Sequence, residues 1–186
     1  MTTNMQENNQ ALAAIYLFNG DDELKRDTTL RRLSERIAAS GDLLMNEETF
    51  NPESIKAPDQ LLDILHTPPF GGQYRLVVIN NAEKLDKNLA EALIHYLEKP
   101  LSSTVLVLLA NKLAANTRLY KAIHTYNPKS IIDVSSIKRS ELPHRLRQLA
   151  ADYRVALDYQ AAQSLIERVG TSMATVNNEL KRLAAW

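Results

Sequence analysis

Five short apolar runs, separated by longer stretches with helical spacing, constrain the fold of this chain more than any other feature of its sequence. The runs span residues 14–18, 43–50, 75–79, 104–109 and 130–134. Unbroken β-branched runs of this length are typical of the buried strands of a parallel sheet. Parallel strands need crossover connections, which helices usually supply. The pattern therefore predicts an α/β domain with a five-stranded parallel sheet, in which the less apolar run 43–50 lies near an edge.

Beyond residue 140 the pattern changes, because apolar residues recur only at helical spacing, in three short stretches. Gly170 is well placed to end the second of these helices, and Thr171 or Ser172 to begin the third. The first ten residues lack an apolar core. We therefore predict a flexible tail at 1–10, an α/β domain at 11–139 and a small helical domain at 140–186.

Composition narrows the possible functions. The chain holds 22 Lys and Arg and 22 Asp and Glu, so it lacks the basic excess usual in a nucleic-acid-binding protein. It has no cysteine, which excludes disulfides, thiolate metal sites and cysteine nucleophiles. The four histidines lie far apart, so no metal site is predicted. No run approaches the roughly 18 apolar residues that span a membrane, and no signal peptide precedes the first strand, so we expect a cytoplasmic protein.

The first chemical test is the phosphate-binding loop, because a parallel sheet with a helical appendage often carries nucleotide chemistry. Such a loop reads G-x-x-x-x-G-K-[ST], and its backbone N–H groups and lysine cradle the phosphates. After the first strand this chain reads NGDDELKRD, with Gly20 as its one glycine, acids from Asp21 onward, and Lys25 outside a Gly-Lys pair. Acids at this point would repel phosphate. The other four glycines, at 41, 71, 72 and 170, do not form the loop elsewhere.

The second test is the metal-binding acid that ends a central strand in nucleotide hydrolases. Asn80 and Asn81 stand at those positions, and neutral amides supply neither a charge for Mg²⁺ nor a general base. We therefore predict that the chain does not hydrolyse ATP. A phosphoacceptor receiver domain is an alternative, because Asp21, Asp22 and Lys138 fit its pattern loosely, but Asn80 would stand at the acceptor position. Helix capping explains Asp21 and Asp22 more simply.

A rigid bend lies between a helix that begins at Pro58 and the strand at 75–79. It reads TPPFGG from Thr67 to Gly72. Prolines stiffen the bend and lower the entropy lost on binding, whereas glycines permit backbone turns that other residues resist. An exposed Phe70 would therefore be a suitable handle for a partner protein. The alternative is that Phe70 folds back into the core and plugs the loop.

The order of these pieces resembles the delta subunit family of the bacterial DNA polymerase III clamp loader. The resemblance covers nearly the whole chain after residue 11, through the runs IYLFNGDDELKRD, LLDILHTPPFGGQYRLVVINNAEKL, TVLVLLANKLAANTRLYKAI and LIERVG…NNELKRL. It implies an AAA+ fold, with an ATPase-type α/β domain and a helical lid, but no working ATP site. Asn111 matches the position at which ATP-using relatives sense the γ-phosphate. Family members also carry a third, collar-forming domain, so we expect this chain to be part of a longer protein.

The resemblance also implies partners. Family members grip the sliding clamp, the beta subunit, and open its ring through a Leu-Phe pair in this bend. The matching residues here are Thr67, Pro68, Pro69 and Phe70, so Phe70 agrees with the family and Pro69 replaces the leucine. Further implied partners are the gamma/tau and delta prime subunits and, through the complex, primer-template DNA. The holoenzyme is a nucleotidyltransferase, whereas this subunit is expected to have no catalytic residues and no cofactor.

A DNA-binding adaptor is a further alternative. It rests on basic pairs on predicted helices, at Lys138-Arg139, Arg145-Arg147 and Lys181-Arg182. Solvated helix faces explain these pairs equally well, because exposed helix surfaces are commonly charged.

Overall fold

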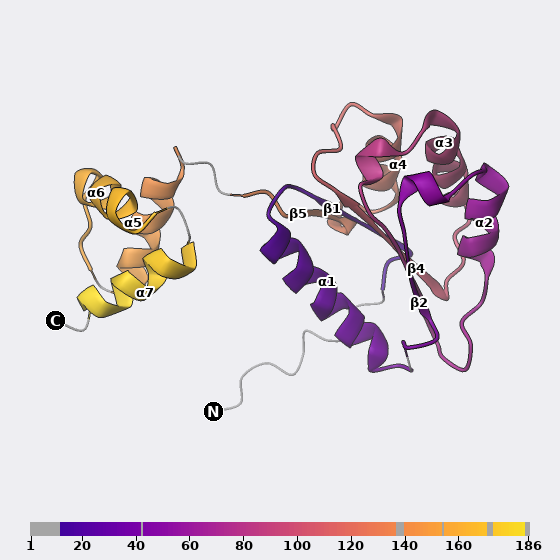
Figure 1. Ribbon diagram of the computed structural model, residues 1–186, viewed down its shortest axis with the longest axis horizontal. Coiled ribbons are helices and arrows are strands. Elements are labelled where there is room, and N and C mark those ends of the chain that lie inside the picture. Colours follow the sequence, from indigo (N-terminus) through magenta and orange to yellow (C-terminus); the bar gives the residue numbers. More distant parts are fainter. Residues whose placement is uncertain (1–11, 42, 137–139, 154, 171–172, 185–186) are drawn as a thin grey trace. The chain divides into compact units, whose positions relative to one another are not determined.

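The computed structural model describes residues 12–41, 43–136, 140–153, 155–170 and 173–184. Its contacts divide the chain into two compact units, Met1–Ser135 and Ser136–Trp186. The first unit is an α/β domain and the second is helical, and each is described here by itself (Figure 1). No helix in the described ranges is both long enough and apolar enough to span a membrane.

A five-stranded sheet forms the centre of the first unit. Its strands are β1 (Ile15–Asn19), β2 (Glu47–Phe50), β3 (Arg75–Ile79), β4 (Thr104–Ala110) and β5 (Ile131–Asp133). They pair in the order β2-β3-β4-β1-β5, and every pairing is parallel. The predicted α/β fold with a parallel sheet is therefore confirmed, and β2 occupies an edge as expected.

Helices cover both faces of the sheet (Figure 1). They are α1 (Glu23–Ala38) on one face, and α2 (Pro58–His66), α3 (Lys87–Tyr96) and α4 (Arg118–Tyr126) on the other. Alternate residues of β3 divide between the two cores, since Val78 packs with Ile37 of α1 while Val77 packs with Leu93 of α3. Residues of β3 and β4 are buried along their whole length, which explains their unbroken apolar sequences.

Two predicted strands are shorter than the sequence indicated. Residues 43–46 form a turn rather than the start of a strand, because the Asn46 N–H donates to the Leu43 carbonyl at 2.8 Å. Strand β2 therefore begins at Glu47. The fifth strand begins at Ile131, because Pro128–Ser130 form the 3₁₀ turn η3 and proline offers no N–H to a strand ladder.

The second unit contains helices α5 (Leu142–Asp152), α6 (Tyr159–Val169) and α7 (Met173–Ala184). Its small core is formed by Leu142, Leu146, Ala150, Ala162, Ile166 and Leu180. Gly170, with φ of 86°, ends α6 as predicted, and Asp158 caps the start of that helix through the Ala161 N–H at 2.7 Å. Thr171 and Ser172, the predicted cap of the third helix, lie outside the described residues.

One buried side chain fixes the end of α2, where the bend before β3 begins. The Thr104 hydroxyl, at the first position of β4, donates to the Leu65 carbonyl at 3.0 Å. Thr104 and Leu65 are both fully buried, so water cannot replace this hydrogen bond. The hydrogen bond therefore ties the last turn of α2 to the central strand and sets where the bend leaves the core.

Replacing Thr104 with valine keeps the shape of the side chain and removes its donor. We expect the free energy of unfolding to fall by about 1–2 kcal/mol, because a buried carbonyl loses its partner. Urea denaturation measures the change. Thr49→Val, on the exposed edge strand β2, is the matched control and should stay within about 0.5 kcal/mol of the original protein. Equal effects of the two substitutions would show that the Thr104 hydrogen bond does not stabilise the fold.

Candidate functional site

The loop between β1 and α1, where a phosphate loop would lie, is closed by the backbone of the sheet. A Cβ added to Gly20 would lie 2.1 Å from the Ser135 nitrogen and 2.2 Å from the Val134 carbonyl carbon. The Gly20 N–H donates to the Ala110 carbonyl at 2.9 Å, and the Asp22 N–H donates to the Val134 carbonyl at 3.0 Å. Both of these N–H groups are therefore engaged within the protein, and a bound phosphate would have to displace their partners.

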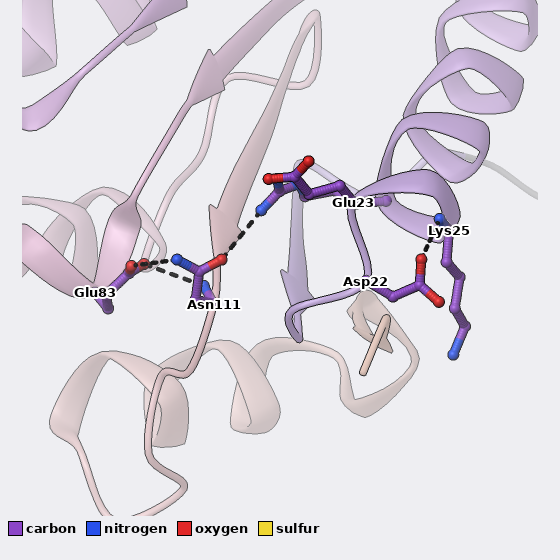
Figure 2. Close-up of polar contacts among 6 residues, drawn as sticks. Asp22, Glu23, Lys25, Glu83 and Asn111 are labelled. Atoms are coloured by element: carbon purple, nitrogen blue, oxygen red, sulfur yellow. Dashed lines mark hydrogen bonds and ion pairs between the residues drawn. The ribbon is translucent and has the colours of Figure 1, made fainter. Parts of the chain in front are cut away.

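The start of α1 is occupied by its own carboxylate. Asp22 is the N-cap of α1, and its Oδ1 accepts the Lys25 N–H at 2.9 Å (Figure 2). Helix capping, rather than a receiver-type acid pair, thus accounts for Asp22. Asp21 is exposed, and the exposed Lys25 side chain extends away from Glu83 and Asn111 in Figure 2. Lys138, the third residue of the receiver alternative, lies outside the described residues.

Asn111 joins two segments at this edge of the sheet instead of standing open. Its N–H donates to Glu83 Oε2 at 3.2 Å and its Nδ2 to Glu83 Oε1 at 3.3 Å (Figure 2). Arg26 of α1 donates to Asn111 Oδ1 at 3.3 Å and lies 3.9 Å from Glu23. This chain of polar contacts links α1, the end of β4 and the 3₁₀ turn η2 (Ala82–Lys84). The Asn111 side-chain amide is therefore committed to protein groups.

The asparagine pair after β3 has a backbone explanation. Asn81 adopts the left-handed conformation, with φ of 48° and ψ of 43°, and begins η2. Asparagine tolerates this conformation better than most residues with a Cβ. The Asn80 N–H donates to the Phe50 carbonyl at 2.8 Å and so extends the pairing of β3 with β2. The pair therefore shapes the turn that carries Glu83 toward Asn111.

One carboxyl at the same edge is clearly perturbed. Hydrogen bonds from the Ser135 side chain and backbone, together with the nearby charge of Lys25, lower the pKa of Asp133. The Ser135 N–H donates to Asp133 Oδ1 at 2.8 Å. Asp133 therefore stays ionised and helps to order the turn that follows β5. The described residues contain no cluster of three or more potential metal-ligating groups.

The bend before β3 is held by a buried asparagine. Asn46 Oδ1 accepts the Phe70 N–H at 2.6 Å, and Asn46 Nδ2 donates to the Phe70 carbonyl at 2.9 Å. Asn46 is fully buried, whereas the Phe70 side chain is 76% exposed. The backbone of Phe70 is thus fixed by two hydrogen bonds while its ring lies in solvent. The alternative in which Phe70 plugs the core is wrong.

Other contacts shape the rest of the bend. The Thr67 hydroxyl donates to the Asp63 carbonyl at 2.7 Å and ends α2. Pro68 is exposed, and Pro69 is half-buried. Gly71 has φ of 62°, a conformation that favours glycine. These contacts make the residues around Phe70 a stiff connection rather than a loose loop.

The structure separates the two groups of residues singled out from the sequence. Thr67 to Phe70 precede β3, whereas Gly20, Asp21, Asn80 and Asn111 follow the ends of their strands. In a parallel sheet the starts and the ends of the strands lie on opposite sides of the sheet, about 16 Å apart along a five-residue strand. The bend and the position where a nucleotide site was tested from the sequence are therefore separate, and Lys25 belongs with the second.

Sequence reasoning missed three residues of these sites, namely Asn46, Arg26 and Glu83. Each of the three contacts a residue that is distant in sequence. Asn46, for example, binds Phe70, which lies 24 positions further along the chain. The one local signal was Asn46 itself, a polar residue inside a stretch that was otherwise interpreted as a strand. Local periodicity does not reveal such a pairing.

The basic pairs that suggested a DNA-binding adaptor are partly engaged within the second unit. Arg147 Nε donates to the Leu157 carbonyl at 3.2 Å, and Arg182 pairs with Glu179 at 2.9 Å. Lys138 and Arg139 lie outside the described residues. The described basic residues therefore include helix-stabilising contacts, as expected for solvated faces.

The parallel sheet has helical layers on both faces, and the loop where a phosphate would bind is closed by the protein backbone. The family described as "DNA polymerase III, delta subunit" matches residues 16–131. The match covers more than half of the chain, and the chain belongs to this family.

A solved structure shares this fold. The Bacillus subtilis DNA clamp loader delta protein (YqeN) is 23% identical, with a TM-score of 0.61, and the match covers 94% of this chain and 53% of that one. The chain thus spans about half the length of that protein. A Thermotoga maritima DNA polymerase III gamma subunit-related protein is 16% identical, with a TM-score of 0.46, and the match covers 95% of this chain and 74% of that one. A search of curated proteins gave no match.

Replacing Asn46 with alanine removes both hydrogen bonds to the Phe70 backbone. We expect the free energy of unfolding to fall by about 1–3 kcal/mol, because two bonds and a packed side chain are lost. Chemical denaturation measures this change, and hydrogen exchange at the Phe70 amide should become faster. Asn116→Ala, at an exposed loop position, is the control. Unchanged exchange at Phe70 would show that Asn46 does not hold the bend.

Proposed function

We propose that this chain is a non-catalytic clamp-loader subunit that binds the sliding clamp through Thr67–Phe70 and helps to open the ring. One observation carries the proposal: a large aromatic ring, 76% exposed, stands on a backbone fixed by a buried side chain. A monomeric fold gains nothing from exposing Phe70, whereas a partner with an apolar pocket gains the burial of its ring.

The expected strength of the contact follows from its chemistry. Burying one phenylalanine side chain stabilises a complex by roughly 1.5–3 kcal/mol. Because the backbone is already ordered, little further entropy is lost on binding. Pro69 stands where the family has leucine, and it is half-buried against the protein. Its role in this proposal is to stiffen the bend, so Phe70 is the principal anchor within the bend itself.

Ring opening requires only a difference in affinity. If the bend binds the open ring more tightly than the closed one, binding shifts the ring population toward the open form. The ATP-binding subunits among its loader partners, which include the gamma/tau and delta prime subunits, would then control when the bend is accessible. Primer-template DNA enters this scheme through the assembled complex.

Replacing Phe70 with alanine should weaken clamp binding about tenfold or more, because the anchor ring is lost. The fold should be unaffected, with the free energy of unfolding within about 0.5 kcal/mol, because the ring makes little contact with the core. Isothermal titration of the purified clamp measures the affinity. Tyr159→Ala, a half-exposed aromatic residue of α6, is the matched control. Unchanged affinity in folded Phe70→Ala protein would refute the proposal.

The proposal also holds that the chain binds no ATP. Support comes from the closed Gly20 loop and from the Asn111 amide, which is committed to Glu83 and Arg26. A ligand at about 100 times its Kd stabilises a protein by about 2.7 kcal/mol, which raises the melting temperature by several degrees. We expect no such rise with millimolar ATP and magnesium, measured by thermal denaturation. A dose-dependent rise beyond that given by magnesium sulfate alone would contradict this part of the proposal.

A further inference from the structure

A second exposed apolar feature lies beside the bend. Residues 43–46 form a β-turn, closed by the hydrogen bond from the Asn46 N–H to the Leu43 carbonyl at 2.8 Å. Leu44 and Met45 occupy its two corners, and their side chains are 88% and 69% exposed. We call residues 43–46 the Leu-Met turn.

The fold itself does not explain apolar corners in this turn. Turn corners usually carry Gly, Pro, Asn, Asp or Ser, each of which assists the backbone. Leu43 packs against the core beneath α1, whereas Leu44 and Met45 belong to none of the buried clusters of the described residues. Their side chains therefore add no core burial.

The Leu-Met turn and the bend are joined into one surface. Asn46 ends the turn, and its buried side chain holds both backbone groups of Phe70. The loop ahead of the turn touches the bend as well, since a Cβ on Gly41 would lie 3.0 Å from the Gly72 Cα. The same asparagine therefore fixes Met45, its neighbour in sequence, and Phe70, its hydrogen-bond partner, in one rigid frame.

Exposed large apolar side chains are concentrated on this surface. Among the side chains that the structure describes, six large apolar ones are exposed, and three of them are Leu44, Met45 and Phe70. The other three are Leu24, Tyr126 and Tyr159. Scattered exposed residues need no explanation, whereas three on two adjoining loops form a patch of the kind that binds a partner.

We propose that Leu44 and Met45 form a second anchor on the partner that receives Phe70. The inference rests on the proposed clamp binding, and the occupant is an apolar surface of the clamp next to the Phe70 pocket. The Leu-Met turn supplies the apolar contact that Pro69 does not provide within the bend. An anchor flanked by further apolar contacts excludes water and strengthens the central one. Glu47, exposed directly after the turn, provides a charged rim.

The test compares three variants of the full chain by titration with the clamp. The double variant Leu44→Ala, Met45→Ala should bind about tenfold more weakly, because two apolar side chains leave the interface. The Leu24→Ala variant changes another exposed leucine, in the first turn of α1, and should bind as the original chain does. Leu24 lies about 20 Å from the opposite end of α1, which precedes the Leu-Met turn. Circular dichroism and melting temperature should be unchanged in all three, since the altered side chains are exposed.

The outcomes separate this inference from the function on which it rests. Weaker binding by both Phe70→Ala and the double variant, with Leu24→Ala unchanged, supports the second anchor. Weaker binding by Phe70→Ala alone overturns the second anchor and leaves the proposed function standing. Unchanged binding by Phe70→Ala overturns the proposed function and the inference with it. An equal loss in Leu24→Ala overturns the inference too, because the effect would not belong to this surface.

Discussion

Burial of β3 and β4 on both faces is the constraint on which the rest of the α/β unit depends. Helices cover each face, so the sheet offers no open surface for binding. In a parallel sheet the connecting loops lie either before the strands or after them, and binding residues are expected in these two sets of loops. We call these the edge before the strands and the edge after the strands. In this chain the two edges differ in character. The edge after the strands is closed by internal polar contacts, whereas the edge before them exposes apolar side chains.

The closed edge is held together by contacts within the protein. Two N–H groups near the phosphate-loop position have acceptors within the protein. The Gly20 N–H donates to the β4 backbone, and the Lys25 N–H at the start of α1 donates to Asp22. Asn111 is held between Arg26 and Glu83, so α1 and η2 are linked by protein groups alone. Each of these donors therefore has a partner within the protein.

Sequence patterns predicted the sheet, the helices and the Gly170 helix end because these depend on local periodicity and on local backbone preferences. The exposure of Phe70 was not predictable in the same way, since a Pro-Pro-Phe-Gly-Gly bend suits a core plug as well as a handle. Asn46 decides between them, through contacts across 24 positions. The prediction that a strand begins at residue 43 was wrong, because residues 43–46 form a turn. This turn ends at Asn46, whose side chain binds the bend.

If Phe70 binds a partner as proposed, holding its backbone from inside the core separates folding from recognition. The hydrogen bonds of Asn46 tie the turn to the bend, whereas the side chains of Phe70, Leu44 and Met45 are largely exposed and lie outside the buried clusters. Exposed side chains at this surface are little constrained by the core. The buried Asn46 is constrained, since its replacement removes both hydrogen bonds to the Phe70 backbone. A rigid frame with adaptable side chains lowers the entropy cost of binding and leaves specificity to the exposed residues.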